Sequence, residues 1–264
     1  MNLGLENKVA LVTGGSLGIG RAVGQALAAE GARVGLCARR EGPLKEAAAV
    51  IRTATGAEVF TIPADLSNLA GIERAKDATI QRFGRIDILV NNAGAIRGGD
   101  FLRTPDEQWI EDWNLKLLGY IRMARTVLPL MQAQGGGRIC NVVGAAGRNP
   151  TAAYLQGGAA NAALINFTKG LADVGAPFNV LVTAVSPAAT RTDRWDSMQR
   201  QLAAATGKPV EELQAEVAKA YPLGRIATAE DVGDLVCFLV SARAAFLTGI
   251  CVTVDGGATR GVYP

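Results

Sequence analysis

Histidine is absent from the 264-residue chain, and this absence excludes more chemistry than any other feature of its composition. No Ser-His-Asp or Cys-His triad, no histidine general base and no histidine-containing metal site can form, so no metal is expected. Cysteine is scarce as well: four residues stand far apart, without a C-x-x-C pair, each within an apolar run. We interpret them as small buried hydrophobic residues in a reducing compartment, not as disulfides or nucleophiles.

The chain also lacks a long apolar run and an excess of one charge. Residues 115–131 form the most apolar stretch in the middle of the chain, but three basic residues interrupt it, which argues against a membrane span. The first eight residues have neither a basic nor an apolar segment typical of a secretory leader. The net charge is only +3, with acids and bases interleaved. The composition therefore indicates a cytoplasmic protein with neither a nucleic-acid nor a membrane partner.

Glycine is abundant, at 32 residues, and short apolar runs alternate with helical patterns along the whole chain. Strands are predicted at 8–12, 33–38, 58–63, 86–90, 137–143, 178–186 and 250–254. Helices are predicted at 18–30, 43–55, 67–83 with Ser67 as a cap, 104–134, 152–174 and 230–241. This alternation predicts an α/β fold, a single doubly wound Rossmann-type domain over residues 1–264, with a seven-stranded parallel sheet and helices on both faces. Residues 191–225 are predicted to form a substrate lid.

A glycine-rich loop, Thr13-Gly-Gly-Ser-Leu-Gly-Ile-Gly20, joins the first strand to the first helix, where backbone N–H groups can approach a pyrophosphate. Asn91-Asn92-Ala93-Gly94 follows the fourth strand. Together these motifs resemble the short-chain dehydrogenase/reductase family, and the similarity extends through Asp65-Leu66 and the segment 186–192 to the C-terminal markers. The resemblance implies cofactor contacts from Gly14, Ser16, Leu17, Gly18, Ile19, Gly20, Arg39, Asp65, Leu66, Asn91, Ala93, Gly94, Asn161, Pro187 and Thr192.

The end of the second strand bears on the choice of cofactor. An acid there would bond to the 2′-hydroxyl of NAD and repel a 2′-phosphate. This chain has Ala38 followed by Arg39 and Arg40, and a guanidinium suits a phosphate. NADP(H) is therefore favoured over NAD(H). The alternative is that Arg39 is a solvated surface residue.

The resemblance also implies a catalytic set of asparagine, serine, tyrosine and lysine, and here the chain departs from the family. Asn114 matches the asparagine. Gly144 stands at the serine position, Gly157 at the tyrosine position and Asn161 at the lysine position. The family's tyrosine is the acid/base, and its lysine lowers the tyrosine pKa and holds the nicotinamide ribose. Asn161 keeps the capacity to bond to that ribose but has no charge.

Tyr154 is the candidate replacement for the missing phenol. It precedes Gly157 by one helical turn, and Gly157 and Gly158 leave space for its ring. Arg148 is the nearest cation in the sequence and a candidate stand-in for the lysine. The alternative is that Tyr154 only forms an aromatic wall of the pocket.

Three functions remain open at this point. The first is an NADP(H)-dependent oxidoreductase for a carbonyl/alcohol pair with a non-standard proton donor. The second is an NADP(H)-binding relative without turnover, a sensor or a partner subunit. The third is a non-redox enzyme on the same scaffold. The family resemblance also implies a small-molecule substrate and a homotetramer or homodimer built on the long helix and the helix after Tyr154.

Overall fold

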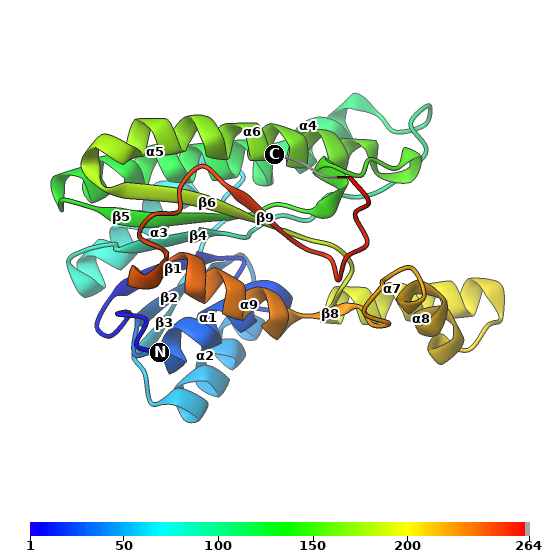
Figure 1. The fold of residues 1–264 in the computed structure, drawn as a ribbon, viewed down its shortest axis with the longest axis horizontal. Coiled ribbons are helices and arrows are strands. Elements are labelled where there is room, and N and C mark those ends of the chain that lie inside the picture. The colour runs from blue at the N-terminus through cyan, green and yellow to red at the C-terminus, as the bar shows by residue number, and fades with distance from the viewer. Residues whose placement is uncertain (262–264) are drawn as a thin grey trace.

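A computed structural model describes residues 1–261 of the protein (Figure 1). Its central sheet has seven parallel strands in the order β3-β2-β1-β4-β5-β6-β9, which confirms the predicted Rossmann-type architecture. The strand order reverses between β1 and β4, and doubly wound folds bind ligands beyond the carboxyl ends of such strands. The strands are β1 (Val9–Thr13), β2 (Arg33–Ala38), β3 (Val59–Pro63), β4 (Ile88–Asn91), β5 (Gly137–Val142), β6 (Val180–Pro187) and β9 (Cys251–Val254).

Helices cover both faces of the sheet (Figure 1). On one face α1 (Gly18–Ala29) packs against α2 (Glu41–Thr55) and α9 (Ala229–Leu239). On the other face α5 (Leu117–Ala133) packs against α3 (Leu69–Phe83), α4 (Asp106–Leu115) and α6 (Leu155–Gly175). Successive residues of β1 alternate between the two cores, since Ala10 and Val12 face α1 while Leu11 faces α5. This alternation explains why the strand is apolar throughout: both of its faces are buried.

The predicted long helix at 104–134 is interrupted, which corrects the sequence interpretation. α4 ends at Leu115, α5 begins at Leu117, and Lys116 forms the break between them. The N-terminus of α3 also differs from the prediction, because Asn68 and not Ser67 is its cap. The Asn68 side chain accepts a hydrogen bond from the backbone N–H of Gly71 at 2.9 Å.

The segment predicted as a lid leaves the body of the fold at the carboxyl end of β6. Two short strands, β7 (Thr190–Arg191) and β8 (Ala227–Thr228), pair with each other. Between them α7 (Asp193–Thr206) and α8 (Val210–Ala218) project to one side of the sheet (Figure 1). The remaining elements are single 3₁₀ turns: η1 (Ala145–Gly147), η2 (Ala152–Tyr154), η3 (Ala176–Phe178) and η4 (Ala242–Ala244).

The four cysteines are free thiols in the structure; Cys37, Cys140 and Cys237 are buried, as predicted, whereas Cys251 is only half-buried. Burial raises the pKa of Cys37, Cys140 and Cys237 to about 12, so these groups are protonated and unreactive at neutral pH. Within residues 1–261 no helix combines the length and apolar character needed to cross a membrane. The same residues contain no group of three or more acidic or cysteine side chains able to hold a metal ion.

Candidate cofactor cleft and active site

The glycine-rich loop is shaped by close backbone approaches that only glycine permits. A Cβ on Gly20 would overlap the carbonyl oxygen of Gly14, and a Cβ on Gly14 would lie 2.8 Å from the side-chain nitrogen of Asn92. Gly18 has a φ of +53° and lies beneath the methyl group of Thr192. Gly18 is also the first residue of α1, so the loop places the N-terminus of this helix at the carboxyl edge of the sheet.

Thr13 joins this loop to the segment after β4. Its hydroxyl donates to the carbonyl of Val90 and accepts from the backbone N–H groups of Asn92 and Ala93, at 2.8 and 3.0 Å. Asn92 donates in turn to the carbonyls of Thr13 and Gly14. Asn91 points the other way. It is buried, and its amide donates to the Asn141 side chain, so the structure brings Asn92 to the cleft in place of the predicted Asn91.

Between these two loops lies a cleft of about 690 Å³. Ten of the fifteen predicted cofactor residues line it, and five do not: Gly20, Asp65, Asn91, Asn161 and Pro187. The cleft adds eight residues that the sequence did not single out as cofactor contacts, among them Arg40, Asn92 and Leu115. Its lining residues are Gly14, Ser16, Leu17, Gly18, Ile19, Ala38, Arg39, Arg40, Ala64, Leu66, Asn92, Ala93, Gly94, Ala95, Leu115, Thr192, Asp193 and Arg194.

Arg39 stands exposed at the end of β2 and has no acidic partner among residues 1–261. Its guanidinium borders both the main cleft and a neighbouring hollow that contains Asp65 and Arg74. The Asp65 carboxylate accepts a hydrogen bond from the backbone N–H of Ser67 at 3.0 Å, which fixes the turn before Asn68. Arg39 and Arg74 make the adenosine end of the cleft basic, as a phosphate site requires.

Beyond the residues that line this cleft, near the carboxyl ends of β5 and β6, lie two buried polar atoms without partners. Asn161 is 2% exposed, and its side-chain oxygen accepts no hydrogen bond from any described residue. The hydroxyl of Ser186, next to Pro187 at the end of β6, is likewise unpartnered within residues 1–261. Such orphaned acceptors cost free energy unless a ligand or water satisfies them. A ribose hydroxyl is a suitable donor for Asn161, so the residues present fit a dinucleotide.

The two vacated glycine positions are filled by neighbouring side chains. A Cβ on Gly157 would fall within the ring of Tyr154, and a Cβ on Gly144 would lie 2.8 Å from the Asn161 side-chain nitrogen. Tyr154 therefore leans over Gly157, in the space where a tyrosine at position 157 would start. Asn161 leans toward Gly144 in the same manner. Each glycine thus admits a side chain that a larger residue would displace: Gly157 admits the Tyr154 ring, and Gly144 admits the Asn161 amide.

Tyr154 ends η2 and caps α6, with its phenol half-buried. Burial raises the pKa of Tyr154, while the guanidinium of Arg194 opposes that shift and Asp112 adds to it. The phenol therefore keeps its proton at neutral pH and is available as a donor.

The predicted cation Arg148 lies elsewhere. Its guanidinium donates to the carbonyl of Cys251 and to the hydroxyl of Thr253, both on β9. The loop between β5 and η2 runs past β9, and this position directs the side chain to that strand. Among the described residues, Arg194 is the cation whose charge lowers the pKa of Tyr154.

Asn114 is also placed differently from the prediction. Its side-chain oxygen accepts from Arg122 at 3.3 Å, and it lines an outer hollow with Ser67 and Asp112. Two residues later, Lys116 is the side chain that enters the buried site. Its ammonium donates to the carbonyl of Val143 at 3.0 Å. The sequence did not single out Lys116, because its periodicity predicts a continuous helix here. A lysine within an apolar stretch is the sequence feature that could have identified it as a site residue.

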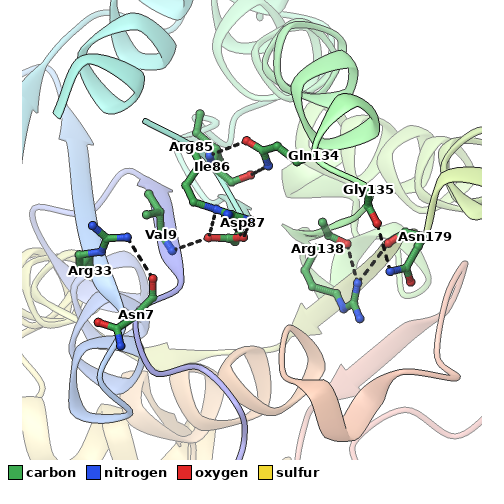
Figure 2. A network of polar contacts seen from close by, with 11 residues as sticks. Asn7, Val9, Arg33, Arg85, Ile86, Asp87, Gln134, Gly135, Arg138 and Asn179 are labelled. Atoms are coloured by element: carbon green, nitrogen blue, oxygen red, sulfur yellow. Dashed lines mark hydrogen bonds and ion pairs between the residues drawn. The ribbon is translucent and has the colours of Figure 1, made fainter. Parts of the chain in front are cut away.

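A separate cavity, of about 240 Å³, lies at the amino edge of the sheet. Figure 2 shows the polar network around it: Asp87 accepts from the backbone of Val9 and from Arg85, Gln134 pairs with the backbone of Ile86, and Arg138 donates to the carbonyl of Asn179. These bonds satisfy the exposed backbone groups where the strands begin. This network ties the strands together far from the cofactor cleft.

The fold and the cleft together define a Rossmann-type dinucleotide-binding protein. The chain belongs to the short-chain dehydrogenase/reductase family: the family described as Enoyl-(Acyl carrier protein) reductase matches residues 14–259. The Escherichia coli 3-oxoacyl-[acyl-carrier-protein] reductase FabG is 35% identical over 259 residues, which cover 97% of this chain and 98% of the relative.

Solved structures agree with this assignment. L-sorbose reductase from Gluconobacter frateurii, complexed with NADPH and L-sorbose, superposes with a TM-score of 0.96 at 32% identity, covering 99% of this chain and 100% of that chain. A variant of actinorhodin polyketide ketoreductase with NADPH gives a TM-score of 0.90 at 30% identity, covering 97% and 98%.

Proposed function

We propose that the protein is an NADP(H)-dependent oxidoreductase of a carbonyl/alcohol pair on a small molecule, with Tyr154 as proton donor. The observation that supports the proposal is the packing of the Tyr154 ring over Gly157, in the space where a tyrosine side chain at position 157 would start. The similar 3-oxoacyl-[acyl-carrier-protein] reductase and the NADPH complex of L-sorbose reductase support the same class of reaction.

The cofactor assignment rests on the cleft. Arg39 and Arg40 would hold the 2′-phosphate, the N-terminus of α1 the pyrophosphate, and Asn161 the nicotinamide ribose. When bound, NADPH supplies the hydride, which is two electrons and one hydrogen nucleus. Leu66 lines the same cleft, and Asp65 lies in the neighbouring hollow beside Arg39, where the two would contact the adenine.

The chain's own part in reduction is the proton. As the new C–H bond forms at the carbonyl carbon, the Tyr154 O–H bond breaks and its proton goes to the carbonyl oxygen, giving the alcohol. The phenolate left on Tyr154 then takes a proton from water. Burial raises the pKa of Tyr154, so its neutral form, which can give a proton to the carbonyl oxygen, dominates near pH 7.

Tyr154→Phe is the test of this proposal. The variant removes only the hydroxyl, so turnover of a ketone panel with NADPH should fall at least about tenfold, since general acids contribute about 10²–10⁴. NADPH affinity, measured by the fluorescence of the bound nucleotide, should stay nearly unchanged because the phenol acts on the substrate oxygen. Unchanged turnover would assign Tyr154 to the pocket wall and remove it from the mechanism.

One observation favours a second candidate, an NADP(H)-binding relative without turnover. Gly144, Gly157 and Asn161 replace three members of the family's catalytic set. The test restores that set with Gly144→Ser, Gly157→Tyr and Asn161→Lys. Because the Tyr154 ring occupies the space above Gly157, the restored chain must also have Tyr154→Ala. Activity in the restored chain together with none in the natural protein would establish the second candidate.

A further inference from the structure

Lys116 is a buried lysine without an acidic partner. It is 8% exposed, and its ammonium makes one hydrogen bond, to the carbonyl of Val143 at 3.0 Å. None of the ion pairs among residues 1–261 includes it. Its aliphatic part packs on Gly94, where a Cβ would lie 2.9 Å from the lysine Cδ. A buried charge with so few partners is costly, which points to a role beyond packing.

The position of the ammonium is next to the vacated catalytic positions. The carbonyl of Val143 belongs to the peptide group that leads into Gly144. Gly144 in turn lies against the amide of Asn161, whose oxygen has no partner in the described part of the chain. Lys116 and Asn161 therefore approach the same peptide from α4–α5 and from α6. The break between α4 and α5 is the local feature that places the lysine there.

Tyr154 belongs to the same electrostatic neighbourhood. The hydroxyl of Tyr120 donates to the carbonyl of Val142, one residue before the lysine's acceptor, and the phenol of Tyr154 raises the pKa of Tyr120. Arg194 acts on both groups, since its charge lowers the pKa of Lys116 and that of Tyr154. Lys116 and Tyr154 thus share neighbours on two sides, at the carboxyl end of β5 and at the start of α7.

We propose that Lys116 is the positioning cation of the active site. From the break between α4 and α5 it supplies the positive charge that Asn161 on α6 lacks. Its ammonium shares the nicotinamide ribose with Asn161, donating to a ribose oxygen while the Asn161 oxygen accepts from a ribose hydroxyl. This inference rests on the proposed reductase function, and its test distinguishes the two.

The surroundings of Lys116 set the pH range in which the ammonium exists. Burial is the main cause that lowers the pKa of Lys116 to about 8, and the positive charge of Arg194 on α7 adds to it. Tyr120 on α5, Tyr154 on η2 and Cys140 on β5 are neutral near this pH, because burial raises their pKa values. Asp112, one turn before Lys116, is paired with Arg97. Below about pH 8 the site therefore contains an ammonium, and above it a neutral amine.

The experiment is the pH profile of kcat/KM for NADPH-dependent ketone reduction. The natural protein should lose activity above about pH 8 as Lys116 loses its proton. Lys116→Met removes the charge at similar length, and Lys116→Gln keeps a hydrogen-bond donor without the charge. Both variants should be at least about tenfold slower below pH 8, the size of a lost charge-assisted bond, and flat across pH 8. Lys169→Met on α6, an exposed lysine paired with Asp173, is the matched control and should retain the natural profile.

A second measurement does not depend on turnover. NADPH titrated by fluorescence should bind about tenfold more weakly to both Lys116 variants at pH 6.5, and the difference should shrink by pH 9.5. Equal affinities at pH 6.5, a flat natural profile across pH 8, or a pH 8 limb that persists in Lys116→Met would each overturn the role of Lys116. If Tyr154→Phe leaves turnover unchanged while the Lys116 variants lose NADPH, the proton donor is wrong and the ribose contact remains.

Discussion

The ring of Tyr154 lies over the α-carbon of Gly157, in the space that a side chain at position 157 would need. The ring fits there only because residue 157 is glycine, and we propose that its phenol replaces the tyrosine of the family. The same relation holds between Asn161 and Gly144 at the neighbouring position. The two pairs, Tyr154 with Gly157 and Asn161 with Gly144, can be tested separately.

Gly157→Ala should remove the Tyr154 phenol from the site without altering the phenol itself. The new methyl group would overlap the ring, which must rotate away, so turnover should fall about as far as in Tyr154→Phe. Steady-state kinetics with one ketone and NADPH measures the loss.

Gly170→Ala supplies the control for this prediction. It lies on the same helix, and a Cβ there meets nothing within 4 Å. We expect unchanged turnover and a gain in stability of about 0.5–1 kcal/mol from helix propensity. If Gly157→Ala is as active as Gly170→Ala, the position of the ring over Gly157 has no part in catalysis.

Arg39 should determine the preference for NADPH over NADH. Losing a charge-assisted bond to the 2′-phosphate costs about 1.5–3 kcal/mol, so Arg39→Ala should weaken NADPH binding roughly ten- to a hundredfold. NADH has no such phosphate, so its affinity should not change in the same variant. Fluorescence titration of both nucleotides measures the two affinities, and similar affinities of the natural protein for both would contradict the prediction.

Lys116→Met should stabilise the fold at pH 7. The pKa of Lys116 is lowered from 10.5 to about 8, so the unfolded chain binds more protons between these values and stability rises with pH across that window. Below pH 8 the buried ammonium destabilises the natural fold by about 3 kcal/mol, and Lys116→Met removes this cost. The variant also loses the hydrogen bond to Val143, which offsets about 1 kcal/mol of the gain. Urea unfolding should therefore give a gain of about 2 kcal/mol at pH 7.

This gain has a distinct pH dependence. It should have largely disappeared by about pH 10.5, where the natural lysine is neutral in the folded chain and only half protonated in the unfolded chain. Lys169→Met, at an exposed ion pair, should show no comparable gain at either pH. A gain that is equal at both pH values would mean that packing, and not charge, is responsible.

The face of α5 and α6 is expected to assemble the protein as a homotetramer or homodimer. Leu118 on α5 and Val174 on α6 remain exposed in the single chain. Light scattering at micromolar concentration should give a mass of two or four chains, and Leu118→Glu should reduce it. A monomer in the natural protein would refute this expectation.

The element order and the cofactor loop could be predicted from the sequence because they depend on local signals. Neighbouring residues carry these signals as apolar runs, helical periodicity and glycines at the ends of elements. The observed bounds of β1, α1 and the loop between them lie within one residue of the predicted ones. The glycines of the loop also predict its close backbone approaches, since no other residue fits them. The position of the cleft follows from the alternation of strands and helices.

The catalytic end of the cleft was decided by tertiary packing. The sequence could offer Tyr154 as a candidate, because Tyr154 and Gly157 are one turn apart. It could not place Lys116, which meets Val143 across 27 residues through an interruption in a helix that the periodicity predicts as continuous. Nor could the sequence predict that Arg148 donates hydrogen bonds to β9, more than 100 residues away. Local patterns determine which elements form, whereas the partner of a long charged side chain depends on which elements pack beside it.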